Sequence, residues 1–337
     1  MSNFTLGVIC AAPRDATSFY RVYGPLGSLR NLMPEMTLQL MTEINWTSIK
    51  QVDAVLMQRP YLSDHIKMAE MIKKNGKPLI LDFDDDLTCV PLDNPNFMTY
   101  QGIEKNVADL VAMADKVIVS TEELKNRFMV GKTNKFWVIP NALDDIFLPL
   151  RLKHESKTSP TLCWRGSETH LRDVAEVSGG LVNALQTFPN AKEWVVEFWG
   201  CCPYFIPPAL NGRIKNFLFH GPTDIMDYHA DLVNSQPRIA IVPLSDSKFN
   251  KAKSHCAWLE FALAGAVVIA PDWPEWKHQG IINYKNPALF GDALSQALAM
   301  SPKQCENMNE RAWKEIRAKY MLSDVNKMRE SLLKSIL

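Results

Sequence analysis

The chain has 337 residues, of which 47% are hydrophobic, and its 37 Lys and Arg residues balance its 37 Asp and Glu residues. This length predicts two domains, and the balanced charge argues against an overall attraction to nucleic acid or to a membrane surface. No stretch is long and uncharged enough to predict a membrane-spanning helix. The N-terminal apolar run is short and lacks a basic segment before it, so we interpret it as a first strand rather than a signal peptide.

The seven cysteines are scattered, and no pair has the spacing of a zinc site. The adjacent Cys201 and Cys202 have the chemistry to bind a soft metal or to oxidise, but we favour loop cysteines without a special role. We therefore expect reduced thiols and a soluble, cytoplasmic protein without membrane partners.

The first part of the chain alternates short apolar runs with segments of helical periodicity, which predicts a parallel sheet covered by helices. Proline and charge then replace this periodicity at 140–160, which we interpret as a linker. The predicted strands are 5–11, 53–57, 78–82, 116–120 and 135–139, and the predicted helices are 63–74 and 103–114.

The alternation restarts after the linker, so the second part predicts another α/β domain. Together they predict two Rossmann-like domains that face each other across a cleft, with domains at 1–145 and 160–301. Residues 302–337 predict one or two amphipathic helices that pack back toward the first domain. The further strands are 161–164, 194–200, 216–219, 238–244 and 266–271, and the further helices lie near 170–187, 223–234 and 250–264.

The segment "LILDFDDDL" at 79–87 places four carboxylates at the end of an apolar strand. Asp-x-Asp is one pattern by which carboxylates hold Mn²⁺ or Mg²⁺ on a diphosphate. The alternative is a metal-free site in which Asp84 or Asp85 orients the hydroxyls of the donor sugar or the acceptor hydroxyl, while the other carboxylates cap the following turn.

The segment 241–271 predicts a strand, a loop rich in lysine and a helix that Gly265 ends. Lys253 lies at the expected helix start, where free N–H groups and the helix dipole favour a phosphate. Glu260 follows seven residues later, about 10 Å along the axis, at a distance suited to the ribose of the same nucleotide. Taken alone, Lys248, Lys251 and Lys253 also fit an ordinary solvated face.

This segment, "FNKAKSHCAWLEFALAGAVVIA", resembles the donor-binding segment of retaining, family-four-like glycosyltransferases with the GT-B fold, which bacteriophages often carry. In that family two Glu with seven residues between them bracket the nucleotide sugar, and the second holds the ribose. Glu260 matches the second, while Ala252 stands at the first. The resemblance implies a nucleotide-sugar donor, most commonly a UDP-sugar, with no metal and no further cofactor.

Other segments carry the same resemblance: "SFYRVYGPLGSL" at 18–29, "VIPNALD" at 138–144, "LCWRGSETHLRD" at 162–173 and "FLFHGPTDIMDYHADL" at 217–232. Through them the resemblance implies that Arg21 and Gly24 face the cleft and that Arg165 reaches the donor phosphates. The implied catalytic residues are Asp84, Asp85, Arg165 and Lys253, and the implied donor-binding residues are Arg21, Gly24, Arg165, Gly166, His170, His220, Gly221, Asn250, Lys253, Ser254 and Glu260.

The sequence leaves two alternatives for the acceptor of the sugar. One candidate is a hydroxymethylated pyrimidine in DNA, which would place the protein in the cytoplasm of a phage-infected host. The other is a polysaccharide or cell-surface glycan. A catalytically inactive protein that only binds nucleotide sugars is the alternative from another class, and Ala252 in place of a Glu is its main support.

Overall fold

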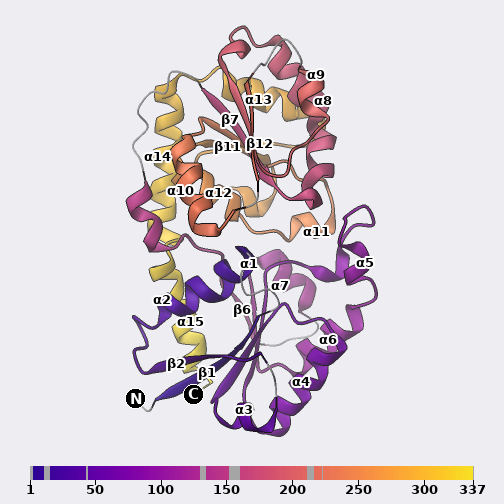
Figure 1. Cartoon of the computed structure of the whole chain (residues 1–337), viewed down its shortest axis with the longest axis vertical. Coiled ribbons are helices and arrows are strands. Elements are labelled where there is room, and N and C mark those ends of the chain that lie inside the picture. The colour runs from indigo at the N-terminus through magenta and orange to yellow at the C-terminus, as the bar shows by residue number, and fades with distance from the viewer. Residues whose placement is uncertain are drawn as a thin grey trace.

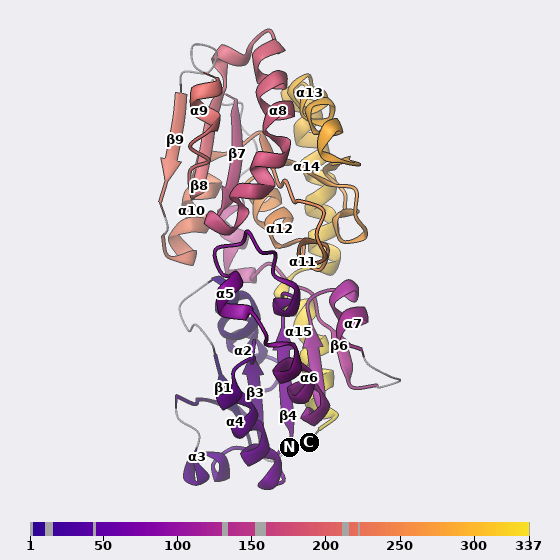
Figure 2. The same cartoon turned by 90° about the vertical axis from the view of Figure 1, so that its right-hand side faces the viewer.

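The computed structural model describes residues 3–10, 16–42, 45–129, 134–151, 160–210, 216–221 and 223–336. It has two lobes, and each contains a parallel sheet with helices packed around it (Figures 1 and 2). Both sheets have six strands in the part of the chain described, and every strand pair is parallel. The α/β fold with two Rossmann-like halves that the sequence predicts is confirmed.

The first sheet has the order β2-β1-β3-β4-β5-β6. Its central strands are buried along their whole length and, apart from Gln58 and Asp82, apolar, as is typical of parallel strands covered on both faces. The strands are β1 (Phe4–Ile9), β2 (Met36–Leu40), β3 (Ala54–Gln58), β4 (Leu79–Phe83), β5 (Lys116–Val119) and β6 (Phe136–Val138). The helices are α1 (Ala16–Ser18), the π-helix η1 (Phe19–Tyr23), α2 (Gly24–Leu29), α3 (Trp46–Lys50), α4 (Ser63–Lys74), α5 (Phe97–Tyr100), α6 (Glu104–Met113) and α7 (Glu122–Phe128), with the 3-10 turns η2 (Leu87–Cys89) and η3 (Asp145–Leu150).

The second sheet has the order β12-β11-β10-β7-β8-β9. Its strands are β7 (Thr161–Gly166), β8 (Val195–Gly200), β9 (Asn216–His220), β10 (Ile239–Ile241), β11 (Val267–Pro271) and β12 (Ile281–Tyr284). Its helices are α8 (Leu171–Thr187), α9 (Ile206–Ala209), α10 (Ile225–Ser235), α11 (Lys248–Lys251), α12 (Cys256–Leu263), α13 (Phe290–Leu298), α14 (Pro302–Lys319) and α15 (Leu322–Lys334), with the 3-10 turns η4 (Glu168–His170), η5 (Ala191–Glu193), η6 (Pro274–Trp276) and η7 (Pro287–Leu289).

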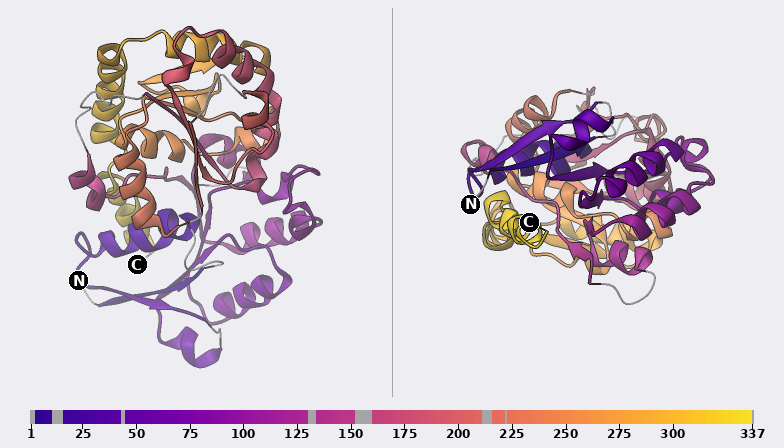
Figure 3. Two further views of the ribbon diagram at one scale, coloured as in Figure 1. Left: turned by 45° about the horizontal axis from the view of Figure 1, so that its top comes forward. Right: turned by 90° about the horizontal axis from the view of Figure 1, so that it is seen from below.

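The last two helices cross from one lobe to the other. Helix α14 packs against α12 of the second lobe, whereas α15 packs against α2 of the first. Figure 3 shows the yellow C-terminal helix beside the first lobe. Buried Leu322, Val325, Leu332 and Leu333 of α15 join the core of that lobe. A parallel bridge between Leu143 and Met321 accompanies this crossing. None of the described helices is long and apolar enough to span a bilayer.

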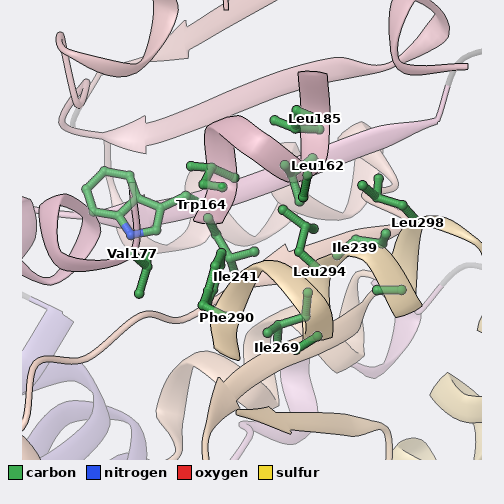
Figure 4. Packing of buried hydrophobic residues seen from close by; sticks show 14 of the residues in the cluster. Leu162, Trp164, Val177, Leu185, Ile239, Ile241, Ile269, Phe290, Leu294 and Leu298 are labelled. Carbon is green, nitrogen blue, oxygen red and sulfur yellow. The ribbon is translucent and has the colours of Figure 1, made fainter. Parts of the chain in front are cut away.

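One face of the second sheet packs against the helices α8 and α13, and its other face packs against α10, α12 and α14. Strand residues such as Leu162, Ile239 and Ile269 are fully or almost fully buried against Phe290 and Leu294 of α13 (Figure 4). Burying side chains of this size stabilises a fold by about 1.5–3 kcal/mol each. This packing fixes the ends of β7 and β10, which point toward the other lobe.

Helices α8 and α13 meet at two glycines. A Cβ atom at Gly180 would lie 2.8 Å from the backbone nitrogen of Gly291, whereas one at Gly179 would meet no atom within 4 Å. We expect Gly180→Ala to lower the free energy of unfolding by about 1–3 kcal/mol through overpacking. Gly179→Ala is the control and should raise it by about 0.5–1 kcal/mol, because alanine favours the helix. Urea denaturation of both variants is the measurement, and equal effects would contradict this packing.

Two predicted segments need correction, and some elements of the structure were not predicted. The predicted helix at 250–264 is two helices, α11 and α12, because the chain turns between Ala252 and His255. The edge strands β2 and β12 and the helix α13 are absent from the prediction. Part of the predicted linker forms η3 and the start of the crossing, while 152–159 lies outside the described residues.

Candidate active site

A cleft of about 180 Å³ lies between the two lobes, at the carboxyl ends of strands from both sheets. The first lobe contributes the side chains that follow β3 and β4, together with Tyr20 of η1. The second lobe contributes the end of β7 and the start of α12. Its charged lining comprises Arg59, Asp84 and Asp85 from the first lobe and Arg165, Lys253 and Glu260 from the second, with His170 beside them.

The carboxylates Asp84 and Asp85 share one guanidinium. Arg59 Nη2 donates to Asp84 Oδ2 at 2.8 Å and to Asp85 Oδ2 at 2.7 Å, and its Nε also donates to Asp84. Burial raises the pKa of Asp84 despite the nearby guanidinium. Burial alone would also raise the pKa of Asp85, but Lys253 and Arg59 together hold it below its usual value. Asp85 is therefore ionised at neutral pH.

The sequence analysis did not single out Arg59. Its backbone has a φ of 47°, in the left-handed region that residues with a side chain rarely adopt. Such strain persists only where the surroundings hold it, here through the two carboxylates. Only the strand order shows its role, because the ends of β3 and β4 are neighbours in the sheet.

The other two carboxylates of the cluster are structural. Asp82 binds Arg21 through two hydrogen bonds of 2.8 and 3.0 Å, and both side chains are buried. Asp86 caps η2 by accepting from the backbone N–H of Thr88. The expectation that Arg21 faces the cleft is therefore wrong, since a buried carboxylate needs its positive partner in the core.

Glu260 is buried on the second lobe, with both carboxylate oxygens in use. Oε1 accepts from the hydroxyl of Tyr20 at 2.9 Å and from the thiol of Cys256 at 3.6 Å. Oε2 accepts from the hydroxyl of Tyr228 at 2.9 Å and forms an ion pair with Arg165 Nε at 2.9 Å. Burial alone would lower the pKa of Arg165, but Glu260 raises it above its usual value. The structure thus turns Arg165 Nε toward Glu260.

The segment between α11 and α12 crosses the interface between the lobes. Lys253 Nζ lies 3.5 Å from Asp85 Oδ1, so these two predicted site residues meet across the cleft. Ser254 Oγ accepts from Asn141 at 2.7 Å, and the carbonyl of Ala252 accepts from the hydroxyl of Thr121 at 3.0 Å. Lys253 and Ser254 both line the cleft just before the first turn of α12.

His170 lies on the cleft, whereas Asn250 lies beneath it. His170 Nδ1 is 2.8 Å from Asp173 Oδ2, and burial lowers the pKa of this histidine. The amide of Asn250 donates to the other oxygen of Asp173 at 2.8 Å and to Ser245. Asn250 is buried and does not line the cleft. Its predicted contact with the donor is corrected to a structural role, because its amide holds Asp173 in place.

The remaining predicted residues lie outside the cleft lining. Gly24 begins α2, next to Asp144. Gly166 ends β7, where a Cβ atom would meet the ring of Trp164 at 2.6 Å. His220 ends β9 and stacks on Trp199, and Gly221 follows it. The donor-binding roles of Gly24, Gly166, His220 and Gly221 stay predictions.

Positive side chains meet the two carboxylates that the sequence offered as metal ligands. Arg59 and Lys253 contact Asp84 and Asp85 directly. Among the residues described, no group of three or more His, Cys, Asp or Glu side chains is arranged to hold a metal ion. Asp84 and Asp85 thus have cationic side chains of the protein as their partners.

No family model matches the chain, and no curated protein matches it. Solved structures match it in fold. An α,α-trehalose 6-phosphate synthase from Burkholderia multivorans has a TM-score of 0.67 at 10% identity, covering 100% of this chain and 99% of that one. A trehalose-6-phosphate structure from E. coli bound with UDP-2-fluoro glucose has a TM-score of 0.63 at 10% identity, covering 98% of both chains.

A third match is a putative UDP-N-acetylglucosamine 2-epimerase from Listeria monocytogenes. Its TM-score is 0.61 at 12% identity, and the alignment covers 99% of this chain and 96% of that one. The three structures share the two-lobed arrangement over nearly their full length. The GT-B fold expected from the sequence is therefore confirmed.

Proposed function

We propose that the protein is a glycosyltransferase that uses a nucleotide-sugar donor, most simply a UDP-sugar. The observation that carries this proposal is the meeting of Lys253 and Asp85 across the cleft, with the start of α12 and Glu260 on one side and two carboxylates on the other. The likeness in fold to structures described as UDP-forming or UDP-sugar-bound supports it. These structures share less than 25% sequence identity with this chain.

The donor diphosphate is assigned to the second lobe, at the start of α12. The first backbone N–H groups of a helix have no partner within it, and the helix dipole adds positive charge there. Lys253 supplies a full charge three residues before Cys256. As the bond between the sugar and the diphosphate breaks, negative charge grows on the leaving group, and these positive groups stabilise it.

The sugar and the acceptor are assigned to the side of Asp84 and Asp85. Ionised Asp85 accepts hydrogen bonds from hydroxyl groups, which suits the orientation of a sugar or an acceptor. Its lowered pKa makes it a weak base, so we assign it orientation rather than proton abstraction. We further propose that the product keeps the anomeric configuration, as the sequence resemblance implies.

Ala252 stands where the family resemblance would place a Glu that contacts the donor sugar. Ala252 is fully buried, and its methyl group packs in the core of the first lobe. Its backbone carbonyl accepts a hydrogen bond from the hydroxyl of Thr121. A carboxylate does not fit such an environment without a partner. We therefore assign contact with the sugar ring to the first lobe rather than conclude that the protein is inactive.

The charge of the cleft favours a neutral acceptor over DNA. Three cations, Arg59, Arg165 and Lys253, face three carboxylates, and each cation is paired. A DNA acceptor would need unpaired positive charge along its path. We propose a glycan acceptor on this ground, and the hydroxymethylated pyrimidine of a phage DNA is the alternative for the test.

The test is transfer of radiolabelled sugar from UDP-glucose and UDP-N-acetylglucosamine to glycans and to hydroxymethylated DNA in parallel. We expect transfer in excess EDTA, because protein cations neutralise the diphosphate. Asp85→Asn should lower turnover about 10- to 100-fold without weakening UDP binding, since it removes an orienting contact. Asp93→Asn is the control, since Asp93 pairs with Arg172 outside the cleft lining. A complete loss in EDTA that Mn²⁺ restores would contradict the metal-free assignment.

A further inference from the structure

Tyr20 belongs to the first lobe but binds two residues of the second. Its hydroxyl donates to Glu260 Oε1 at 2.9 Å and lies 2.9 Å from His229 Nε2. The side chain is buried, and its ring packs edge-on against Phe19. It lies in the π-helix η1, a rare backbone form that occurs frequently at functional sites.

Both carboxylate oxygens of Glu260 are contacted by protein groups while Tyr20 is in place. A carboxylate offers about four acceptor positions. Tyr20, Tyr228, Arg165 and Cys256 contact Glu260 at 2.9, 2.9, 2.9 and 3.6 Å. A ligand hydroxyl that takes the position on Oε1 held by the Tyr20 hydroxyl must therefore displace Tyr20.

Tyr20 differs from the other three because it comes from the opposite lobe. Arg165, Tyr228 and Cys256 lie on β7, α10 and α12, in the same lobe as Glu260. The residue after Tyr20, Arg21, is fixed to the first lobe through Asp82 and through the carbonyl of Ile139 at 2.9 Å. A shift between the lobes therefore moves Tyr20 away from Glu260 and leaves the other three partners in place.

The contacts of Tyr20 also compete with one another. His229 Nδ1 lies 2.7 Å from the carbonyl of Ile225, which only accepts, so Nδ1 carries a proton. Burial lowers the pKa of His229, so its ring is neutral and Nε2 has no proton to give. The single hydroxyl proton of Tyr20 therefore serves either Glu260 or His229, but not both. This makes Tyr20 the partner of Glu260 that a ligand displaces most readily.

From these contacts we infer that Tyr20 is a built-in competitor of the nucleotide: its hydroxyl occupies the position on Glu260 that a ribose hydroxyl takes when the donor binds. This inference rests on the proposed function, together with the expectation from the sequence that Glu260 binds the ribose of the donor. Donor binding then requires Tyr20 to leave, so the affinity for nucleotide depends on the relative position of the lobes.

The experiment is calorimetric titration of the full chain with UDP, and with ADP and GDP in parallel. Tyr20→Phe keeps the ring and its packing but removes the hydroxyl. We expect it to bind UDP about tenfold more tightly than the wild type, because a hydrogen bond to a charged group no longer has to be broken. The same variant should show no gain with 2′,3′-dideoxy-UDP, which lacks both ribose hydroxyls.

Two controls define the interpretation. Tyr23→Phe makes the same chemical change at the end of η1, on a side chain that is 40% exposed, and should leave the affinity for UDP unchanged. In a Glu260→Gln background, Tyr20→Phe should lose most of its gain. Melting curves of each variant check that the fold is kept.

Equal or weaker UDP binding by Tyr20→Phe would overturn the inference and leave the proposed function standing. A gain that persists with 2′,3′-dideoxy-UDP would also overturn it, since the ribose hydroxyls would not be involved. If neither the wild type nor Tyr20→Phe binds UDP, ADP or GDP, both the inference and the proposed function fail.

Discussion

Replacing Lys253 by alanine is expected to lower the turnover of a nucleotide sugar by about 30- to 1000-fold, which corresponds to about 2–4 kcal/mol of transition-state stabilisation. Lys253 is the cation nearest the start of α12 along the chain, and in the structure it faces Asp85 at 3.5 Å. We expect it to exchange this carboxylate for the leaving diphosphate during transfer. Initial rates at saturating donor are the measurement.

Lys251→Ala is the matched control. Lys251 lies two residues earlier, pairs with Asp246 and does not line the cleft. We expect its removal to leave turnover unchanged, whereas a general loss of positive charge would affect both variants alike. Near-normal turnover of Lys253→Ala would contradict the donor assignment.

Arg165→Ala should also reduce turnover, and because Arg165 pairs with Glu260 it should weaken UDP binding as well.

The sheets were largely predictable because their central strands are continuous apolar runs. Strands β4 and β11, for example, are buried at every position. Strands β2 and β12 were missed because their sequences, "MTLQL" and "IINY", mix polar and apolar residues and lack a strong apolar pattern. Both lie at the edge of a sheet, but edge position alone does not hide a strand, since the edge strands β6 and β9, "FWV" and "NFLFH", were predicted.

The break between α11 and α12 could not be read from the sequence. The apolar spacing continues through 250–264, which favours one helix. The break coincides with contacts to the other lobe, from Thr121 to the carbonyl of Ala252 and from Asn141 to Ser254. These partners are more than 100 residues away, so local pattern carries no information about them.

The site was predictable in its residue types but not in its pairings. Asp84, Asp85, Lys253 and Glu260, which charge at a strand end and a helix start favours, line the cleft. Arg165, His170 and Ser254, which the family resemblance implies, line it as well. The partners of Glu260 were not foreseen, because Tyr20 lies 240 residues away in sequence. Arg59 was missed because a single arginine after a strand has no motif.

The second large effect concerns stability rather than turnover. Arg21→Met is expected to lower the free energy of unfolding by about 3–5 kcal/mol, because it leaves Asp82 as an unpaired charge in the core. Both side chains are almost fully buried, at 1% exposure each. Lys67→Met is the control: it breaks the exposed pair with Asp64, and we expect no resolvable change. Both variants are to be compared by chemical denaturation.

Arg329 is a second buried guanidinium close to Asp82, so it affects the expected loss of stability. Burial, together with the charge of Arg21, lowers the pKa of Arg329 to about 9. It donates to Asn326 at 3.1 Å, and its Nη2 has no hydrogen-bond partner among the described residues. The core therefore already holds more positive than negative charge, and removing Arg21 relieves part of that repulsion. If Arg329 moved onto Asp82, the loss on Arg21→Met would fall well below 3 kcal/mol.

The double variant Arg21→Met/Asp82→Leu separates these outcomes. Removing both charges replaces a buried ion pair with apolar groups, which is often neutral, whereas removing one leaves a desolvated charge. We therefore expect the double variant to be more stable than Arg21→Met alone. A double variant that is no more stable than Arg21→Met would show that the loss comes from the packing and from the bonds of Arg21 to Ile139 and Asn141, rather than from the unpaired carboxylate. Because Tyr20 precedes Arg21 in η1, comparing the two variants by chemical denaturation also tests whether the ion pair of Arg21 with Asp82 is what holds η1 on the first lobe.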